Sequence, residues 1–226
     1  LIATNKIILF FNEASARIGI GHLMRSQNLA KEMQSRGYTI VGVTVGEQKA
    51  VRAVEKCALQ SEFNWLIKIV SSCSQAKRLI REVTPSLVVI DSTNLAKEII
   101  FFCYNNEIKS VALDYFDVSN SLPNTVINLI DHNPLAIRGG VPNRLGIQYF
   151  EGPKYAIVRD EFLKARKSRL NSVESIDLHR IVIAFGGADP AGNSRKIIKF
   201  LQDFSNKLCI DLIVGPLFFS ELRESL

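Results

Sequence analysis

The sequence predicts an α/β protein built on a doubly wound parallel sheet. Short apolar runs alternate with segments of helical periodicity along most of its 226 residues. One of these runs, Leu87–Ile90, is uninterrupted, as expected for a strand covered on both faces. A hydrophobic content of 47% supports a full core, and the length allows one domain and part of a second.

The first strand, loop and helix form the stretch that the rest of the chain is organised around. An apolar run over 6–11 predicts the strand, and a helical pattern that opens near His22 continues to about Arg36. Gly37 ends this helix, and residues 38–45 predict a second buried strand. Between strand and helix, Gly19 and Gly21 break the loop, where a ligand can approach the main chain closely.

His22 lies where the helix begins, so the helix dipole disfavours its imidazolium form and favours a bound phosphate, carboxylate or sugar hydroxyl. A neutral histidine there is suited to act as a general base. The alternative is a glycine turn whose histidine only caps the helix. A nicotinamide fingerprint would need glycine at position 24, where the chain has Met24.

The strands that follow bring further polar residues to the same edge. Asp91 and Asp114 each end an expected strand, and right-handed crossovers place all the strand ends on one rim with Gly19 and His22. The alternative is that an aspartate at a strand end only caps the next helix. Two such aspartates beside a loop with a histidine favour a ligand-binding or catalytic site instead. The expected strands are 66–70, 87–90, 110–113 and 125–130, and the expected helices are about 47–57, 75–83 and 95–106.

Residues 131–134 bring Asn133 to this edge, and glycines, a proline and lost periodicity make 138–152 a connecting region. A second strand, glycine loop and helix unit follows, with a strand at 180–185, a loop at 186–190, a helix at 193–204 and a strand at 208–214. We expect a complete domain over 1–163 and the beginning of a second over 164–226. Because the sequence starts at Leu1 and ends in a helical pattern, either end could be a boundary within a longer protein.

Four blocks of sequence resemble the pseudaminic-acid-pathway nucleotide-sugar hydrolases and the related spore-coat polysaccharide proteins. The blocks occur in the family's order over nearly the whole chain. They are Ala14-Ser15-x-x-Ile18-Gly19-x-Gly21-His22-x-Met24-Arg25, then Asp91-Ser92, then Gly152-Pro153-Lys154-Tyr155-Ala156-Ile157-Val158-Arg159-x-Glu161-Phe162, and Phe185-Gly186-Gly187-Ala188-Asp189.

The resemblance implies a glycosyltransferase-B architecture, in which two Rossmann-like domains face each other across a cleft. It also implies that water attacks the anomeric carbon of a UDP-linked deoxy amino sugar and releases free sugar and UDP, without cofactor or metal. His22 matches the catalytic base, and Asp91 could orient it or bind sugar hydroxyls. The further substrate-binding residues that we expect, from the resemblance and from the strand ends together, are Arg17, Gly19, Gly21, Arg25, Asp114, Asn133, Arg159, Gly186 and Gly187.

Some features depart from the family's pattern. Hydrolases of this family often have a tyrosine where this chain has Thr93, and often paired aspartates where it has Asp114-Tyr115. The family's nucleotide-gripping block falls beyond residue 226. We expect Asp189 to cap a helix and not to contact a phosphate. A sugar transferase that activates an acceptor hydroxyl, and a non-catalytic nucleotide-sugar binding module, stay open as rival classes.

The remaining composition excludes several other classes. The four cysteines and three histidines show neither zinc-ligand spacing nor a disulfide framework. The net charge of +6 is scattered apart from a cluster at 164–169, which we interpret as a solvated helix face, so nucleic-acid binding is not indicated. No apolar run could span a bilayer and no leader is recognisable, so we expect a soluble, cytoplasmic protein without a membrane partner. The sequence does not indicate an oligomeric state.

Overall fold

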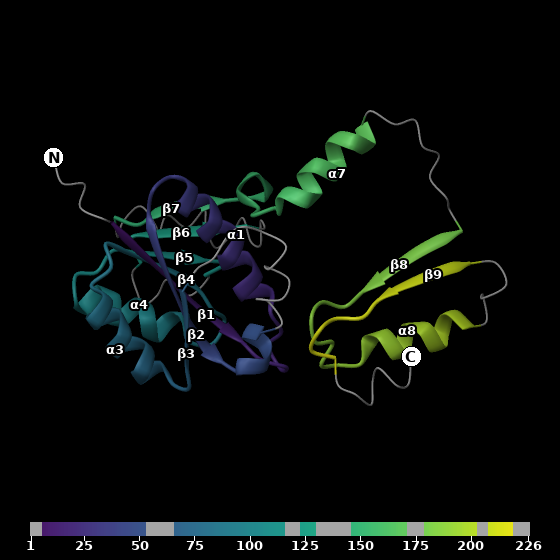
Figure 1. Ribbon diagram of the computed structural model, residues 1–226, viewed down its shortest axis with the longest axis horizontal. Coiled ribbons are helices and arrows are strands. Elements are labelled where there is room, and N and C mark those ends of the chain that lie inside the picture. The colour runs from purple at the N-terminus through teal and green to yellow at the C-terminus, as the bar shows by residue number, and fades with distance from the viewer. Residues whose placement is uncertain are drawn as a thin grey trace.

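The computed structural model describes residues 6–52, 66–115, 123–129, 146–170, 179–202 and 208–218. Its first unit is a 7-stranded sheet in the order β3-β2-β1-β4-β5-β6-β7, with every neighbouring pair parallel (Figure 1). Its strands are β1 Ile7–Ala14, β2 Thr39–Gly46, β3 Leu66–Val70, β4 Leu87–Asp91, β5 Ser110–Leu113, β6 Thr125–Asn128 and β7 Gln148–Glu151. The predicted parallel α/β architecture is therefore confirmed.

Helices cover both faces of this sheet, as a doubly wound fold requires. The helices of the first unit are α1 Gly21–Ser35, α3 Cys73–Val83 and α4 Ala96–Asn105, close to the predicted bounds. Residues 48–52 are also helical, while the rest of the helix expected over 47–57 lies outside the described residues. α3 begins at a Ser72 side chain that accepts a hydrogen bond from the Gln75 amide, and it ends before Pro85, as predicted.

The alternation of side chains along β1 divides the core into two layers. Leu9 and Phe11 join the apolar cluster of α3 and α4, whereas Ile8 and Phe10 join the cluster that holds Leu23 of α1. All four β1 side chains are at most 3% exposed. The central strand is thus fixed by packing on both sides, which makes its carboxyl end a rigid platform.

The strand order reverses on either side of β1, because the chain passes from β1 to β2 and β3 on one side and then to β4 on the other. In open α/β sheets, ligands bind at such a switch point, outside the carboxyl ends of the strands. In register at this end lie Thr44 of β2, Asn12 of β1 and Asp91 of β4, all completely buried. The fold therefore directs attention to the polar ends of β1 and β4.

Strand β7 corrects one prediction, which made residues 138–152 a connecting region. Gln148–Glu151 pairs with β6 at the edge of the sheet, and its residues alternate between exposed and half-buried. An edge strand with one solvated face lacks the continuous apolar run that marked the central strands. Composition alone therefore concealed it.

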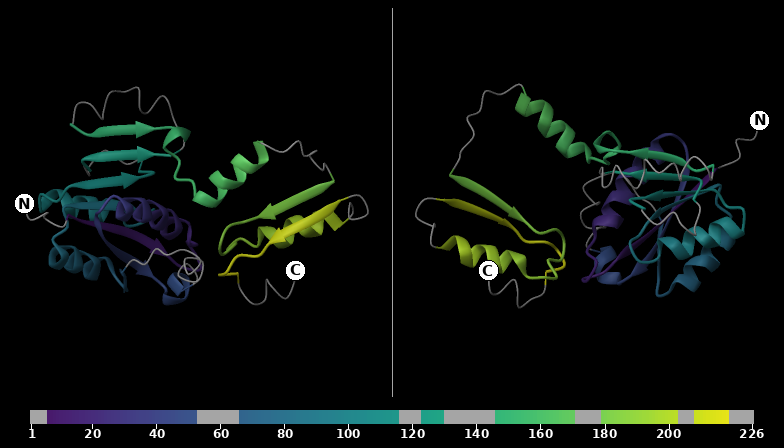
Figure 2. Two further views of the ribbon diagram at one scale, coloured as in Figure 1. Left: turned by 45° about the horizontal axis from the view of Figure 1, so that its top comes forward. Right: turned by 180° about the vertical axis from the view of Figure 1, so that it is seen from behind.

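The second unit contains β8 Arg180–Ala184, α8 Asn193–Leu201 and β9 Cys209–Ile213, with β8 and β9 forming a parallel pair. It is joined to the first by η1 Pro153–Tyr155 and α7 Asp160–Leu170 (Figure 2). No residue of α7 is buried, which confirms the basic cluster at 164–169 as a solvated helix face. The expected boundary between residues 163 and 164 falls inside α7 and stays a prediction.

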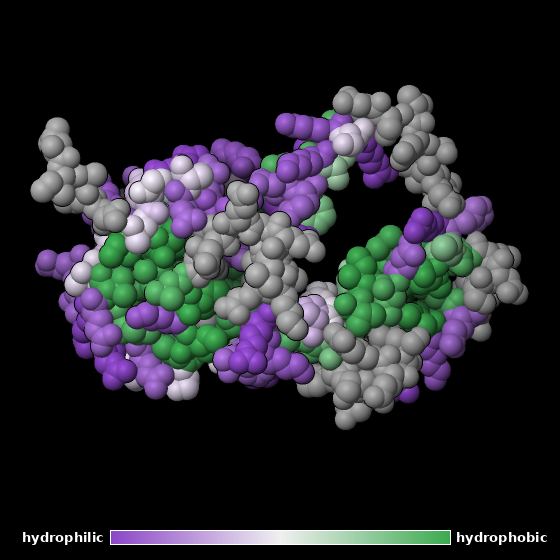
Figure 3. Space-filling model, viewed as in Figure 1, coloured by the Kyte–Doolittle hydropathy of each residue, from purple (hydrophilic) through white to green (hydrophobic). Residues whose placement is uncertain are grey.

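Apolar surface lies over β8 and β9 in Figure 3. In this part of the chain, the residues Val182, Ile213 and Val214 are 62%, 54% and 44% exposed. The two units touch through buried side chains, because Ala188 and Leu217 belong to the same apolar cluster as Ala14 and Ile20. Among the helices that the structure describes, none has the length and apolar character needed to cross a membrane.

Candidate active site

A histidine and a buried aspartate form the centre of the candidate site. His22 is the second residue of α1, and its Nδ1 lies 2.7 Å from Oδ1 of Asp91, the last residue of β4. The Asp91 side chain is completely buried, while that of His22 is 22% exposed. The two residues that we predicted as catalytic thus form a dyad, with the imidazole between the buried carboxylate and solvent.

Arg25 holds this carboxylate from the same helix. Its Nε donates to Asp91 Oδ2 at 2.7 Å, and its guanidinium also donates to Asp91 Oδ1 and to Asp114. Burial opposes the charge on Arg25, but its hydrogen bonds with Asp91 and its attraction to Asp91 and Asp114 outweigh burial and raise its pKa. Arg25 therefore stays cationic and keeps an anionic Asp91 compensated.

Asp114 ties this cluster to the neighbouring strands. It follows β5 in a left-handed conformation, with φ of 49°, and its Oδ1 accepts a hydrogen bond from the Leu129 amide at 2.9 Å. The predicted meeting of His22, Asp91 and Asp114 at one edge is confirmed. Arg25 is engaged with both Asp91 and Asp114. This gives Arg25 and Asp114 a positioning role, and their predicted substrate contacts stay predictions.

The hydrogen bonds of His22 define its tautomer. Ionised Asp91 can only accept, so Nδ1 of His22 donates to it and carries the ring proton of the neutral form. On the other side of the ring, Nε2 lies 3.0 Å from Oγ1 of Thr93. In the neutral ring Nε2 is an acceptor, so the Thr93 hydroxyl donates to it. The dyad thus presents its basic nitrogen on its more exposed side.

Glu13 holds the loop that carries Thr93, and the sequence analysis missed this residue. Its carboxylate is buried at the end of β1, accepts hydrogen bonds from the Ser92 hydroxyl and, at 3.0 Å, from the Asn94 amide. The Ser92 hydroxyl accepts in turn from the Leu95 amide at the start of α4. The signal that could have found Glu13 was an acidic residue two positions after the apolar run, on the rim already predicted.

The glycine loop before α1 is closed on itself. Ser15 and Gly19 exchange two backbone hydrogen bonds, and the Ile18 amide donates to the Ser15 hydroxyl. Gly19 has φ of 87°, which glycine adopts without strain. Its amide is therefore engaged within the loop, so a sugar contact from it stays a prediction. Arg17 is exposed at the tip and has no ion pair among the described residues.

The start of α1 has backbone donors without a partner among the residues that the structure describes. Ile20 precedes the helix without a side-chain cap, and no acidic residue lies in the first turn. The first intrahelical bond runs from the Met24 amide to the Ile20 carbonyl, so the amides of Gly21, His22 and Leu23 have no partner within the helix. Together with the helix dipole they favour an anionic group beside His22.

The loop of the second unit lies against the glycine loop before α1. A Cβ on Gly187 would come within 2.7 Å of Cγ1 of Ile20, so a larger residue at this position would have to displace the Ile20 side chain. Gly186 precedes it with φ of 72°. The Asp189 carboxylate accepts hydrogen bonds from the amides of Asn193 and Ser194 at 2.9 and 2.8 Å, which confirms Asp189 as a helix cap. A diphosphate contact from Gly186 and Gly187 stays a prediction.

The other predicted site residues are not joined to the dyad. The Arg159 guanidinium stacks on the Phe162 ring at 4.7 Å, and its neighbour Asp160 pairs with Lys31 far along α1. Within the described ranges, no ion pair links Arg159 to His22 or Asp91. Asn133 lies outside the described residues.

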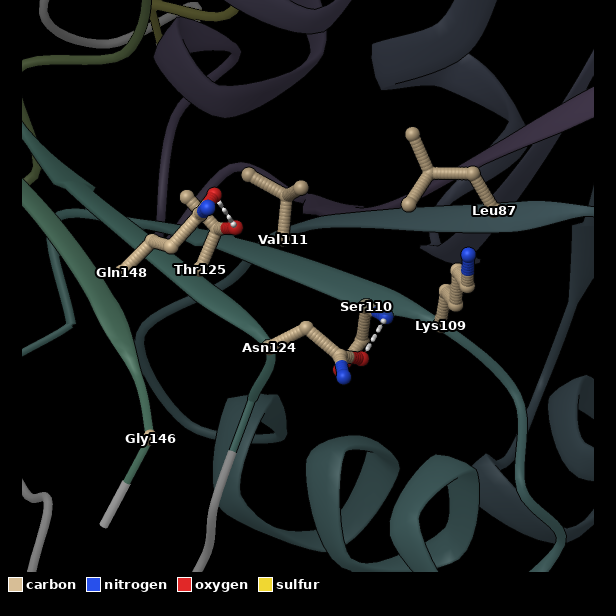
Figure 4. A pocket seen from close by; sticks show the side chains of 8 residues that line it. All are labelled: Leu87, Lys109, Ser110, Val111, Asn124, Thr125, Gly146 and Gln148. Atoms are coloured by element: carbon tan, nitrogen blue, oxygen red, sulfur yellow. Dashed lines mark hydrogen bonds between the residues drawn. The ribbon is translucent and has the colours of Figure 1, made fainter.

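A pocket of about 340 Å³ lies at the opposite end of the strands (Figure 4). Its lining comes from the starts of β4, β5, β6 and β7 and from residues just before them. In a doubly wound sheet the ligand edge is the carboxyl one, so this pocket is not part of the site around His22. The side chains that line it include Leu87, Lys109, Asn124 and Gln148.

Comparison with solved structures establishes the fold class. The chain superimposes on MurG of Acinetobacter baumannii with a TM-score of 0.52 at 12% identity, covering 97% of this chain and 70% of MurG. The UDP-N-acetylglucosamine 2-epimerase of Rickettsia bellii gives 0.56 at 9% identity, with 98% and 64% covered. A glycosyltransferase of Rickettsia africae gives 0.51 at 12% identity, with 93% and 69% covered. The chain has a glycosyltransferase-B-like α/β fold.

Sequence comparison adds a distant relative. The chain is 27% identical over 216 residues to the uncharacterized protein MJ1062 of Methanocaldococcus jannaschii, and the match covers 93% of this chain. It covers 43% of MJ1062, so the chain spans less than half the length of that relative. No known family model matches the sequence.

Proposed function

We propose that the protein is a nucleotide-sugar hydrolase that cleaves a UDP-linked deoxy amino sugar into free sugar and UDP, as in the pseudaminic-acid-pathway family that its motifs resemble. The observation that carries this proposal is the Asp91–His22 dyad, with a 2.7 Å contact and Nε2 on the more exposed side of the ring. Its place at the switch point of a glycosyltransferase-B-like fold supports it. Such a base suits the activation of water or of another hydroxyl.

In the proposed reaction, the oxygen of water attacks the anomeric carbon while the bond to the diphosphate oxygen breaks. The proton of the water passes to His22, and the electron pair of the broken bond leaves with UDP. Asp91 stabilises the imidazolium that forms, as a buried carboxylate does in other histidine dyads. The open amides at the start of α1 offer donors to anionic or hydroxyl groups of the substrate.

A sugar transferase is the second candidate, because a protein of this fold among the structural neighbours is named a glycosyltransferase. In that case His22 would deprotonate an acceptor hydroxyl instead of water. The nucleotide product is the same in both reactions. The fate of the sugar is what separates them.

The test is to incubate the protein, at its natural length, with a panel of UDP-linked sugars that includes acetamido and deoxy amino sugars. Free sugar and UDP are measured with and without acceptor alcohols. Equal release of sugar and UDP without acceptor is the expected result. Release of UDP only when acceptor is present would favour the transferase, and donor binding without any UDP release would indicate a binding module.

A further inference from the structure

Thr93 occupies the only lone pair that His22 can use as a base. In the neutral ring with a proton on Nδ1, the lone pair of Nε2 points outward in the ring plane. Oγ1 of Thr93 lies 3.0 Å from Nε2. A water or sugar hydroxyl therefore meets the Thr93 oxygen before it meets the imidazole.

The position of Thr93 is fixed by the hydrogen bonds of the residues before and after it. Its neighbours Ser92 and Asn94 both donate to the buried Glu13 carboxylate. Ser92 also accepts from the Leu95 amide at 2.9 Å, which anchors the loop to α4. Thr93 itself is exposed, and its hydroxyl donates its proton to Nε2, so its oxygen can still accept a hydrogen bond from an incoming hydroxyl.

We propose that Thr93 is a catalytic residue, a hydroxyl relay that carries the proton of the nucleophile to His22. This proposal rests on the function proposed above and names a further residue for it. The nucleophile gives its proton to Oγ1 of Thr93 as its oxygen bonds to the anomeric carbon. In the same step Thr93 gives its own hydroxyl proton to Nε2. Thr93 ends unchanged, His22 becomes imidazolium, and the electron pair of the glycosidic bond leaves with the diphosphate.

The relay would let His22 accept a proton from a nucleophile that does not contact the imidazole ring. A proton can pass to a general base directly or through one intervening hydroxyl, provided that each hydrogen bond is short. Thr93 extends the basic function from the half-buried ring into the exposed part of the site. Because Glu13 fixes the loop, this extension does not depend on a mobile water molecule.

The test compares Thr93→Val, which keeps the shape and removes the hydroxyl, with Thr93→Ser, which keeps the hydroxyl. We expect Thr93→Val to lower kcat by about 100-fold, the scale of a lost general-base pathway, with little change in KM. Thr93→Ser should retain kcat within about 10-fold. Thr125→Val is the matched control on β6, where the Thr125 hydroxyl contacts Gln148 on the opposite rim, and it should leave kcat unchanged.

A second measurement decides the question even if Thr93→Val folds poorly. In mixtures of H₂O and D₂O, a relay moves two protons in the rate-limiting step, so kcat of the wild type should fall along a curve with deuterium content. A straight line, a Thr93→Val variant as fast as wild type, or equal losses in Thr93→Val and Thr93→Ser would each overturn the relay. A wild type that releases no UDP would overturn the proposed function instead, so the two failures are distinct.

Discussion

Two strand, glycine loop and helix units occur in this chain, and they treat the start of their helices in opposite ways. In the first unit, α1 starts without a side-chain cap and without an acidic residue in its first turn. In the second unit, the Asp189 carboxylate accepts hydrogen bonds from the first amides of α8. One helix start is therefore open to an external anion, whereas the other is neutralised by the protein itself.

In both units, a closely packed glycine from the second strand region fixes the start of the loop or the loop itself. A Cβ on Gly46, at the end of β2, would lie 1.9 Å from the Ala14 carbonyl oxygen, and a Cβ on Gly215, after β9, would lie 2.5 Å from the carbonyl oxygens of Gly186 and Gly187. In each unit, a glycine at the end of the second strand or just after it packs directly on backbone where the first strand passes into its loop. The shared packing is structural, so the chemical difference lies in the helix start and in His22.

The largest expected effect is a loss of turnover on changing the dyad of His22 and Asp91 at the start of α1. Asp91→Asn should lower turnover by about 100-fold, a loss of the size expected for the base itself, because the amide no longer stabilises an imidazolium or enforces the Nδ1 proton. UDP release under saturating donor measures this loss. Asp114→Asn is the matched control, since Asp114 contacts Arg25 and not His22. Equal losses in both variants would mean that the dyad has no special role.

The next largest expected effect is a loss of stability on changing one of the two closely packed glycines. Gly46→Ala should lower the free energy of unfolding by about 2 to 3 kcal/mol, because the clash is with backbone that cannot move aside. Urea denaturation followed by circular dichroism measures this change. Gly37→Ala is the control, because it meets open space and bears only the strain of its φ of 87°, so it should cost less. A Gly46→Ala variant as stable as its parent would show that the loop is not held by this contact.

The cap of α8 predicts a smaller change that depends on pH. Burial by itself raises the pKa of Asp189, but hydrogen bonds from Ser194 and Asn193 outweigh it and hold the pKa below its usual value. The cap therefore stabilises the fold above the pKa of an unfolded aspartate, and the contribution is lost as the pH falls through the folded pKa.

Replacing Asp189 by alanine should cost about 1 kcal/mol at pH 7, the usual value of a lost helix cap. The difference in unfolding free energy between wild type and Asp189→Ala should shrink as the pH is lowered. A difference that stays constant down to acidic pH would contradict a charged cap.

Removal of metal should give the smallest effect, namely none. Among the described residues, no group of three or more histidine, cysteine, aspartate or glutamate side chains could hold a metal ion. UDP release should therefore be unchanged by a chelator. Loss of activity that one divalent ion restores would contradict the metal-free dyad.

The sequence predicted the central contacts of the site because they follow from topology. Parallel strands with right-handed crossovers bring their ends to one edge, and this rule placed His22, Asp91 and Asp114 together. The contacts of Glu13 with Ser92 and of Thr93 with His22 depend on loop paths and side-chain rotamers, which no periodicity encodes. The close packing of Gly46 and Gly215 is likewise a property of the folded chain, and β7 lacked the apolar run of a central strand.

The most direct test of the central claim measures UDP release by the wild-type protein and by His22→Ala, with a donor that the panel identifies. The account predicts that His22→Ala keeps the circular dichroism spectrum and donor affinity of the parent while its turnover falls by about 100-fold or more. A folded His22→Ala variant that releases UDP at the wild-type rate would contradict the assignment of His22 as the base.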